Sequence, residues 1–238
     1  WWVEYETTEP NTAIIVTDKG ATLNEGGVKL DGGKRPAESI NVNGTNITNT
    51  GNVSSDVTAT KNGNDVDVTV TAGGTFELAV PGAEDSAVSF KNPSTDATAT
   101  YKVKEDGSIA LGDGSSIEFT IKSGTNTIVN PAGQNEGDVS FKVTKEGVEI
   151  IIEPGKTVVI DGKEYEAGAS GATIVIDDNG NKIITEGSIS VPQGETVNVK
   201  DSEGNLIIDF GQNIAGYVHM VLQDTNLFTG TVMDNIRY

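Results

Sequence analysis

Apolar and polar residues alternate along much of this chain with a period of two, which is typical of β-strands. Residues 65–70, DVDVTV, are the clearest example, because their valines fall on one face and their polar side chains on the other. The runs IIIE (150–153) and TVVID (157–161) alternate less strictly. We expect these two runs to form strands that are covered on both faces. No run of about 18 apolar residues is present, so the pattern predicts no membrane insertion.

Glycine turns divide much of the chain into four similar units, at residues 57–82, 97–133, 139–168 and 172–210. Each unit opens with a predicted strand, turns at an Asn-Gly, Asp-Gly or Glu-Gly pair, and returns as a second strand. The turn glycines are spaced by 44, 40 and 33 residues: Gly63, Gly107, Gly147 and Gly180. Units of this kind resemble the β-repeats of bacterial cell-surface proteins. They predict an all-β fold of antiparallel strands in one or two β-sandwich-like modules with glycine-turn hairpins, and a rod-like stack of hairpins is the alternative.

Changes in composition divide the chain into four predicted parts. They are an N-terminal part with strands and a polar segment (1–55), two β modules (56–135 and 136–218) and a C-terminal tail of uncertain origin (219–238). In the N-terminal part, Pro10 separates two candidate strands. Residues 41–55 are rich in Asn, Thr and Gly, which predicts a loop or an exposed edge strand.

The composition supports this fold class. Valine (25), isoleucine (21) and threonine (27) greatly outnumber leucine (7) and methionine (2), and 29 glycines are spread along the chain. Branching at Cβ restricts the χ1 angle and suits a pleated surface better than a helix. An all-helical fold is therefore excluded.

Charge and cysteine content restrict the functions that the chain can have. With 16 basic and 35 acidic residues, the formal charge is −19, and only two arginines are present. Nucleic-acid binding and attraction to anionic membranes both require excess positive charge, so neither is expected. The absence of cysteine excludes disulfides, thiolate catalysis and Cys-based zinc sites. The chain begins at Trp1, and we expect an exported protein, extracellular or on the cell surface, that has lost a signal segment; a trimmed end is the alternative.

The first residues, WWVEYET, are a candidate strand for assembly between copies of the chain. A strand with Trp1, Val3 and Tyr5 on one side, flanked by Trp2, is suited to pairing with the open sheet edge of a second copy. The alternative is that this strand pairs within its own sheet. The two tryptophans are also candidates for stacking on sugars, but a role as core or interface anchors is favoured over that one.

Two kinds of surface site are suggested by short motifs. The Asn-X-Ser/Thr triplets NGT, NIT and NVS predict glycosylation at Asn43, Asn46 and Asn52. The segment DDNGN places oxygen-bearing side chains at alternating positions, which makes Asp177, Asn179 and Asn181 weak candidates for a calcium site. The twelfth position from Asp177 is Ser188, where a helix-loop-helix calcium loop requires glutamate. Hairpin turns use the same residue types, so a purely structural role is the alternative.

The chain shows no constellation of catalytic residues. Its single histidine, His219, cannot form a histidine-based zinc site or a pair of bases, and no nucleophile-elbow pattern is present. Pairs of carboxylates of the glycosidase type can arise by chance among 35 acidic residues, but aromatic residues, which line sugar clefts, make up only 5% of the chain. We therefore predict no enzymatic activity, no catalytic residue, no cofactor and no metal site beyond the weak calcium candidates.

Two short C-terminal segments resemble known families. LIIDFGQNIAGYV (206–218) is similar to an Asp-Phe-Gly-Gln-Asn motif in the accessory β-sandwich of bacterial α-L-rhamnosidases, a resemblance that implies a β-sandwich and a link with glycans. VLQDTNLFTGTVMDNIRY (221–238) resembles the Q-loop region of ABC exporter nucleotide-binding domains, in which Gln223 would reach towards the metal and the γ-phosphate. No Walker A motif is present to complete an ATP site, so the second resemblance implies no ATPase activity.

The sequence therefore predicts a non-enzymatic, exported structural protein that assembles with copies of itself into a filament or surface layer through strand addition. The alternative is a glycan-binding accessory module of a carbohydrate-active enzyme, with glycans as its partner. A hydrolase in its own right is a third and less supported reading.

Overall fold

The computed structural model describes residues 4–122, 124–200, 203–209 and 218–221, and the regular secondary structure of this part of the chain is almost entirely β-strand, joined by turns and short loops. The described residues form 22 strands, most of them paired antiparallel, and a single 3-10 turn at Glu84–Ser86. The predicted all-β class is confirmed. Two pairings are parallel, β3 with β5 and β19 with β20. None of the described residues belongs to a helix that could span a membrane.

The strands form two long ladders, which we call sheet I and sheet II. Sheet I contains, in the order of pairing, β1 (Glu6–Thr7), β4 (Gly27–Asp31), β7 (Asp56–Asn62), β8 (Asp65–Val70), β11 (Ala99–Val103), β12 (Ile109–Ala110), β15 (Val139–Thr144) and β16 (Gly147–Ile152). It continues through the second half of β18 (Lys163–Ile176) and the first half of β19 (Lys182–Val191) to β20 (Asn198–Lys200) and β21 (Leu206–Asp209).

Sheet II is built in the same way from the other strands. It contains β2 (Ala13–Thr17), β3 (Gly20–Glu25), β5 (Ser39–Val42), β6 (Thr45–Asn49), β9 (Thr75–Ala79), β10 (Val88–Lys91), β13 (Ser116–Ile121), β14 (Gly124–Val129) and β17 (Thr157–Ile160). It ends with the first half of β18, the second half of β19 and β22 (Val218–Val221). The long strands β18 and β19 therefore belong to both sheets and join them.

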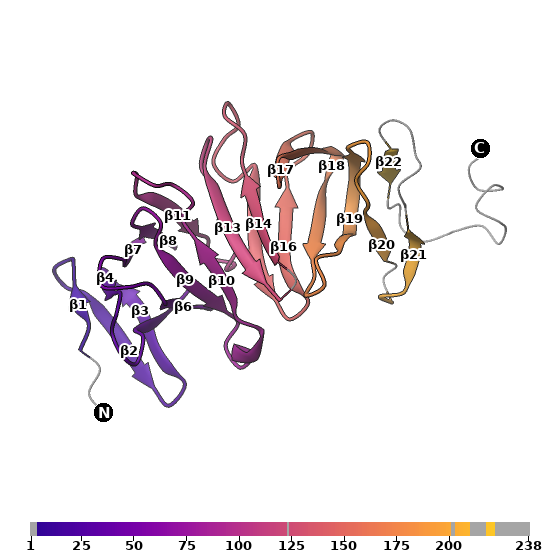
Figure 1. Ribbon diagram of the computed structural model, residues 1–238. Coiled ribbons are helices and arrows are strands. Elements are labelled where there is room, and N and C mark those ends of the chain that lie inside the picture. The colour runs from indigo at the N-terminus through magenta and orange to yellow at the C-terminus, as the bar shows by residue number, and fades with distance from the viewer. Residues whose placement is uncertain (1–3, 123, 201–202, 210–217, 222–238) are drawn as a thin grey trace.

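Successive hairpins alternate between the two sheets, so that position along the molecule follows position in the sequence (Figure 1). Each hairpin pairs with the preceding and the following hairpin of its own sheet. The predicted boundary between residues 135 and 136 lies in the loop between β14 and β15, and sheet I continues across it, because β12 pairs with β15. The described strands thus follow the rod-like stack of hairpins more closely than a pair of separate sandwiches.

The stack has a structural repeat of about 40 residues. Where the chain crosses from sheet I to sheet II, a glycine with φ between 65° and 76° recurs at intervals of 40 or 41 residues: Gly33, Gly73, Gly114 and Gly155. The four turn glycines expected from the sequence lie at the sheet I hairpins, and all have positive φ: Gly63, Gly107, Gly147 and Gly180. Each repeat therefore contains one hairpin in each sheet.

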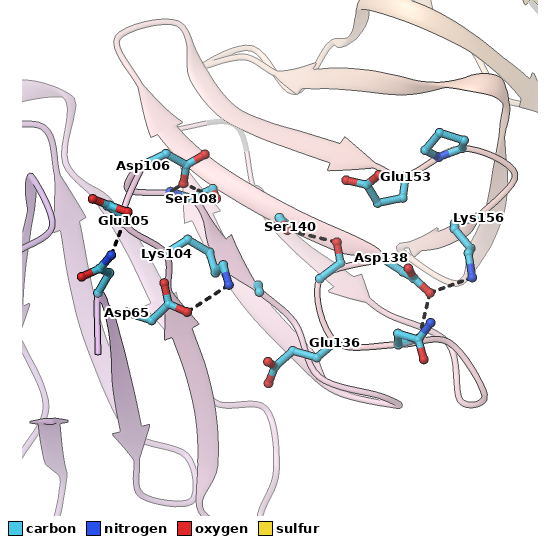
Figure 2. A pocket seen from close by; sticks show the side chains of 15 residues that line it. Asp65, Lys104, Glu105, Asp106, Ser108, Glu136, Asp138, Ser140, Glu153 and Lys156 are labelled. Atoms are coloured by element: carbon cyan, nitrogen blue, oxygen red, sulfur yellow. Dashed lines mark hydrogen bonds and ion pairs between the residues drawn. The ribbon is translucent and has the colours of Figure 1, made fainter. Parts of the chain in front are cut away.

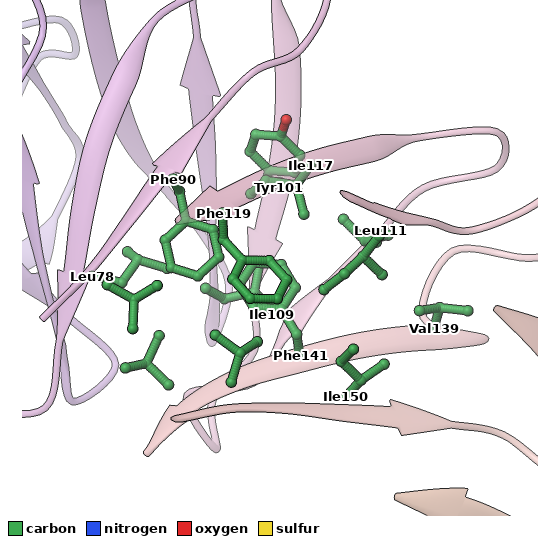
Figure 3. Packing of buried hydrophobic residues seen from close by; sticks show 14 of the residues in the cluster. Leu78, Phe90, Tyr101, Ile109, Leu111, Ile117, Phe119, Val139, Phe141 and Ile150 are labelled. Carbon is green, nitrogen blue, oxygen red and sulfur yellow. The ribbon is translucent and has the colours of Figure 1, made fainter. Parts of the chain in front are cut away.

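The core lies between the two sheets as one continuous hydrophobic cluster that extends from Leu23 to Val199. At its centre, Phe90 of sheet II stacks on Phe141 of sheet I with ring centroids 5.1 Å apart (Figure 3). Phe90 also contacts Phe76 and Phe119 at 5.8 and 5.9 Å. Apolar contact across the layers, together with the backbone ladders within them, holds the stack together.

The expected alternation in 65–70 is confirmed, because every second residue of β8 is buried. The expectation that IIIE and TVVID are covered on both faces is wrong. In β16 and β17 every second residue, including Ile151 and Val159, is only half-buried. Each sheet has one layer against it, so an outward β-branched residue keeps its strand conformation while facing solvent.

The expectation that residues 41–55 form a loop or an exposed edge is wrong for the first part of this segment. Strands β5 and β6 lie inside sheet II between β3 and β9, and Val42 and Ile47 are buried. The polar residues alternate with these apolar ones, and Asn43-Gly44 supplies the two positive φ angles of a tight turn. In this segment, the alternation of apolar and polar residues therefore predicts the strands better than the overall polar composition does.

Candidate functional site

The predicted donor strand at the N-terminus lies partly in the described residues, and these pair within their own chain. Glu6 and Thr7 form β1, opposite Lys29 and Val28 of β4. The Tyr5 side chain packs on the core cluster, and its hydroxyl donates to the carbonyl oxygen of Ser39 at 2.6 Å. This is the alternative arrangement, pairing within the same sheet. Trp1, Trp2 and Val3 lie outside the described residues.

Burial and the nearby carboxylate of Glu38 raise the pKa of Tyr5, so its hydroxyl remains protonated as a donor. Beside it, Lys29 forms ion pairs with Glu6 at 3.0 Å and with Asp31 at 3.3 Å. The end of sheet I is therefore covered by a short strand and carries charges of both signs. These are two of the ways in which proteins protect a sheet edge from further pairing.

The end of sheet II is different. Strand β2, AIIVT, pairs with β3 on one side, and no strand in the described part of the chain pairs with its other side. Its Ile15 and Val16 side chains are 52% and 72% exposed, and Val53 is the other large hydrophobic residue that is exposed among the described ones. An uncharged, apolar strand with an unpaired edge is suited to accept another strand. We regard this edge as the candidate functional site.

Sequence reasoning did not single out β2, although a signal was present. Residues 13–17 contain no charged residue in a chain with a net charge of −19. The run predicts a strand, but its place at an edge depends on which strands pair, and the sequence does not show that.

The three predicted glycosylation sites have different surroundings. Asn43 is half-buried in the β5–β6 turn, and its Nδ2 donates to the carbonyl oxygens of Asn64, Val103 and Lys104 at 2.9 to 3.2 Å. Asn46 is half-buried in β6, where its Oδ1 accepts from Asn41. The amide of Asn43 thus has a structural role in this fold.

Asn52 is the exposed member of the three. Its Oδ1 accepts from the backbone N–H of Ser54 at 3.0 Å and from the Ser54 hydroxyl at 2.6 Å, while no residue in the described ranges bonds to its Nδ2. The residue between them, Val53, is 86% exposed. Of the three triplets, NVS is therefore the one that the folded chain presents to solvent, and glycosylation there stays a prediction.

The weak calcium candidates lie in the turn between β18 and β19. Oδ1 of Asp177 accepts from the backbone N–H groups of Asn179 and Asn181, both at 2.9 Å, and its Oδ2 accepts from the Asn181 side chain at 3.0 Å. These bonds are those of a turn closed by an aspartate. Within the described ranges, no group of three His, Asp or Glu side chains is placed so that it could hold a metal ion.

A polar groove of about 990 Å³ lies over sheet I, near the two-residue strand β12 (Figure 2). Small residues, including Ser108, Ala110 and Ser140, line it together with charged residues of the surrounding loops. Two ion pairs lie along it, Lys104–Asp65 at 2.9 Å and Lys156–Asp138 at 2.9 Å. None of the residues that line the groove is aromatic.

Two carboxylates of this groove, those of Asp106 and Asp138, are stabilised in their ionised form. Hydrogen bonds from the Ser108 side chain and backbone lower the pKa of Asp106, and the Lys156 ammonium lowers the pKa of Asp138. A general acid near neutral pH requires a raised pKa instead. These two carboxylates are suited to stabilising their loops rather than to donating a proton.

The two C-terminal segments with family resemblances are described only in part. Residues 206–209 form β21 and 218–221 form β22, which places His219 in a strand. Gln223 and the rest of 222–238 lie outside the described residues. Both resemblances stay predictions.

Comparisons of this chain with protein-family models, with curated protein sequences and with solved structures gave no significant match in any of the three.

Proposed function

We propose that this protein is a non-enzymatic structural subunit that assembles with copies of itself by strand addition, as part of a filament or surface layer. The architecture supports this role, because every repeat is already joined to the next by backbone ladders in two sheets. A ladder of this kind can be continued by a strand from another molecule without any new type of contact.

The observation that carries the proposal is the open edge of β2. Sheet I ends in a short, charged edge, whereas sheet II ends in five uncharged residues, two of which expose large apolar side chains. Native proteins usually cover or charge such an edge unless it has a partner. A partner strand would bury this apolar surface and satisfy the backbone groups along it.

We place the protein outside the cell or on its surface. A cysteine-free, strongly acidic chain of turn-rich β-repeats is consistent with that location, and its charge keeps the free subunit soluble. The exposed NVS triplet at Asn52 agrees with it as well.

The alternative function, a glycan-binding module, has one feature in its favour, the groove over sheet I. Sugar-binding sites commonly stack rings on aromatic side chains, and this groove has none. Self-assembly is therefore the better-supported proposal.

Sedimentation velocity of the full chain, across two orders of magnitude in concentration at about 0.15 M salt, tests the proposal. We expect oligomers whose share rises with concentration, and negative-stain images of longer particles. A monomer over the whole range would contradict self-assembly. Saturable binding on a glycan array by that monomer would instead support the alternative.

A further inference from the structure

The geometry of the β2–β3 hairpin shows which backbone groups of β2 are open to a partner. Thr17 pairs with Gly20 across a two-residue loop, and Ile15 pairs with Thr22. In an antiparallel ladder, residues that exchange hydrogen bonds alternate with residues that do not, starting from the pair that closes the loop. Thr17 and Ile15 therefore bond to β3, and the N–H and C=O groups of Ile14 and Val16 point to the open edge.

The sequence of β2 is self-complementary around Ile15. If a second β2 lies antiparallel to the first, with Ile15 opposite its own copy, Ile14 of each strand lies opposite Val16 of the other. Ile14 and Val16 are the two residues with open backbone groups, so this register forms four backbone hydrogen bonds. Shifting the register by one residue would lose this match between bonding groups.

The same register pairs apolar side chains on both faces of the sheet. Ile15 meets Ile15 on the outer face, where each is 52% exposed in the single chain. On the inner face Val16, which is 72% exposed, lies beside the partner's Ile14, a residue that already packs on the core cluster. Cross-strand pairs of β-branched residues stabilise a sheet, so both exposed side chains gain a contact.

We infer that β2 is the junction between two copies of this chain, which pair β2 to β2 across a two-fold axis that passes beside Ile15. This deepens the proposed self-assembly, on which it rests, by naming the surface of one junction; a two-fold junction closes as a dimer, so growth into a filament or layer needs a second contact elsewhere on the chain. Sheet II then continues from one copy into the other. The two stacks join at their N-terminal ends.

The charge of the chain favours a second copy over a foreign basic partner. Strand β2 has no charged residue, although acidic residues outnumber basic ones by 35 to 16 along the chain. A basic peptide would be attracted more strongly to the acidic surfaces elsewhere on the chain than to this uncharged strand. Two copies with a charge of −19 repel each other, so apolar contacts and backbone hydrogen bonds must hold the junction together. Salt screens the repulsion between the copies, and we therefore expect it to strengthen the junction.

Cysteine cross-linking tests the register directly, because the natural chain has no cysteine. Residues opposite each other in a non-hydrogen-bonded pair have Cα atoms about 4.5 Å apart, which a disulfide can span. We expect Ile15→Cys to form a covalent dimer under mild oxidation. Thr22→Cys is the matched control, since it is exposed on the neighbouring strand but lies one strand further from the axis. Equal cross-linking of the two variants would overturn the inference.

Ile15→Lys tests the energetics, because it places like charges opposite each other at the axis. We expect its dissociation constant, measured by sedimentation, to rise at least about tenfold. The circular dichroism spectrum and the melting temperature, both taken at a concentration where the wild type is monomeric, should stay those of the wild type. If the wild type assembles and this variant assembles equally well, the β2 junction is wrong but self-assembly stands. If the wild type itself stays monomeric, both proposals fail.

Discussion

Three buried asparagines act as anchors between the repeats. Asn49, Asn92 and Asn130 each lie where the chain leaves a sheet II hairpin for sheet I, and each is at most 1% exposed. Their Nδ2 groups donate to backbone carbonyl oxygens at or just after the end of the preceding sheet I strand, and to one in their own loop. Burying an amide is favourable only when its hydrogen bonds are made, so these residues fix how the loops lie against each other.

We expect Asn92→Ala to lower the free energy of unfolding by about 2 to 4 kcal/mol. Nδ2 of Asn92 donates to the carbonyl oxygens of Val70, Thr71 and Ala97, at 2.9 to 3.2 Å, and the substitution leaves these acceptors without their donor. Urea unfolding followed by circular dichroism measures the change.

Two further variants control this experiment. Asn92→Asp keeps the shape of the side chain but turns a carboxylate oxygen towards three carbonyl oxygens. At neutral pH it should therefore lower the free energy of unfolding at least as much as Asn92→Ala does. Asn24→Ala changes an exposed residue of β3 and should have little effect. An Asn92→Ala protein as stable as Asn24→Ala would contradict the anchoring role.

At the scale of single elements, the hairpins depend on the backbone conformation of their turns. The β17–β18 hairpin turns at Asp161 and Gly162, with φ of 51° and 79°, and the β5–β6 hairpin turns at Asn43 and Gly44, with φ of 47° and 81°. Two positive φ angles in succession match the twist of the paired strands. The Asn-Gly and Asp-Gly pairs therefore set both the position and the register of these hairpins.

Gly162→Ala should lower the free energy of unfolding by about 1 kcal/mol, because an L-residue is strained in the left-handed region. A Cβ atom at Gly162 would meet no atom within 4 Å, so the effect reports backbone conformation and not a clash. Thermal unfolding measures it.

Gly162→Asn is the matched variant, since asparagine tolerates positive φ better than alanine does. It should recover much of the lost stability. Equal destabilisation by alanine and asparagine would show that something other than the φ angle matters at this turn.

At the scale of the whole molecule, the alternation of hairpins between two sheets makes the chain a stack of similar units. Gly73 and Gly114 occupy equivalent positions with φ of 66° and 65°, each two residues before a sheet II strand. Between them lies one complete repeat, with β9 and β10 in sheet II and β11 and β12 in sheet I. Repeats that contact only their neighbours can be removed as units.

Deleting residues 73–113 should therefore leave a shorter stack that still folds and unfolds cooperatively. The deletion joins Ala72 to Gly114 and lets β8 meet β15 in sheet I while β6 meets β13 in sheet II. Circular dichroism and thermal unfolding test this, with a lower melting temperature expected because Phe76, Phe90 and Tyr101 leave the core.

Deleting the β9–β10 hairpin alone is the control. Sheet II would then be one hairpin shorter than sheet I, and the inner face of β11, with its buried Tyr101 and Val103, would lose its cover. We expect loss of cooperative unfolding in this variant only. Equally cooperative folding of both deletions would contradict the repeat as the structural unit.

Local pattern was sufficient to predict the class of fold and many of its turns. Val66, Val68 and Val70 alternate with polar residues because a strand directs successive side chains to opposite faces, and the structure buries all three. The turn glycines at 63, 107, 147 and 180 have positive φ as expected, since that conformation is a property of a few adjacent residues.

The open edge of β2, the pairing of β1 with β4 and the roles of the buried asparagines were decided by the tertiary structure. Asn92 and the exposed Asn52 are the same residue type, and only the carbonyl groups brought to Asn92 from 22 residues earlier make it an anchor. Likewise, nothing within AIIVT distinguishes an edge strand from a central one. The sequence by itself determined strand and turn, which depend on neighbours along the chain. Which strands lie side by side, and which edge remains free, depends on contacts between distant residues, and these exist only once the chain has folded.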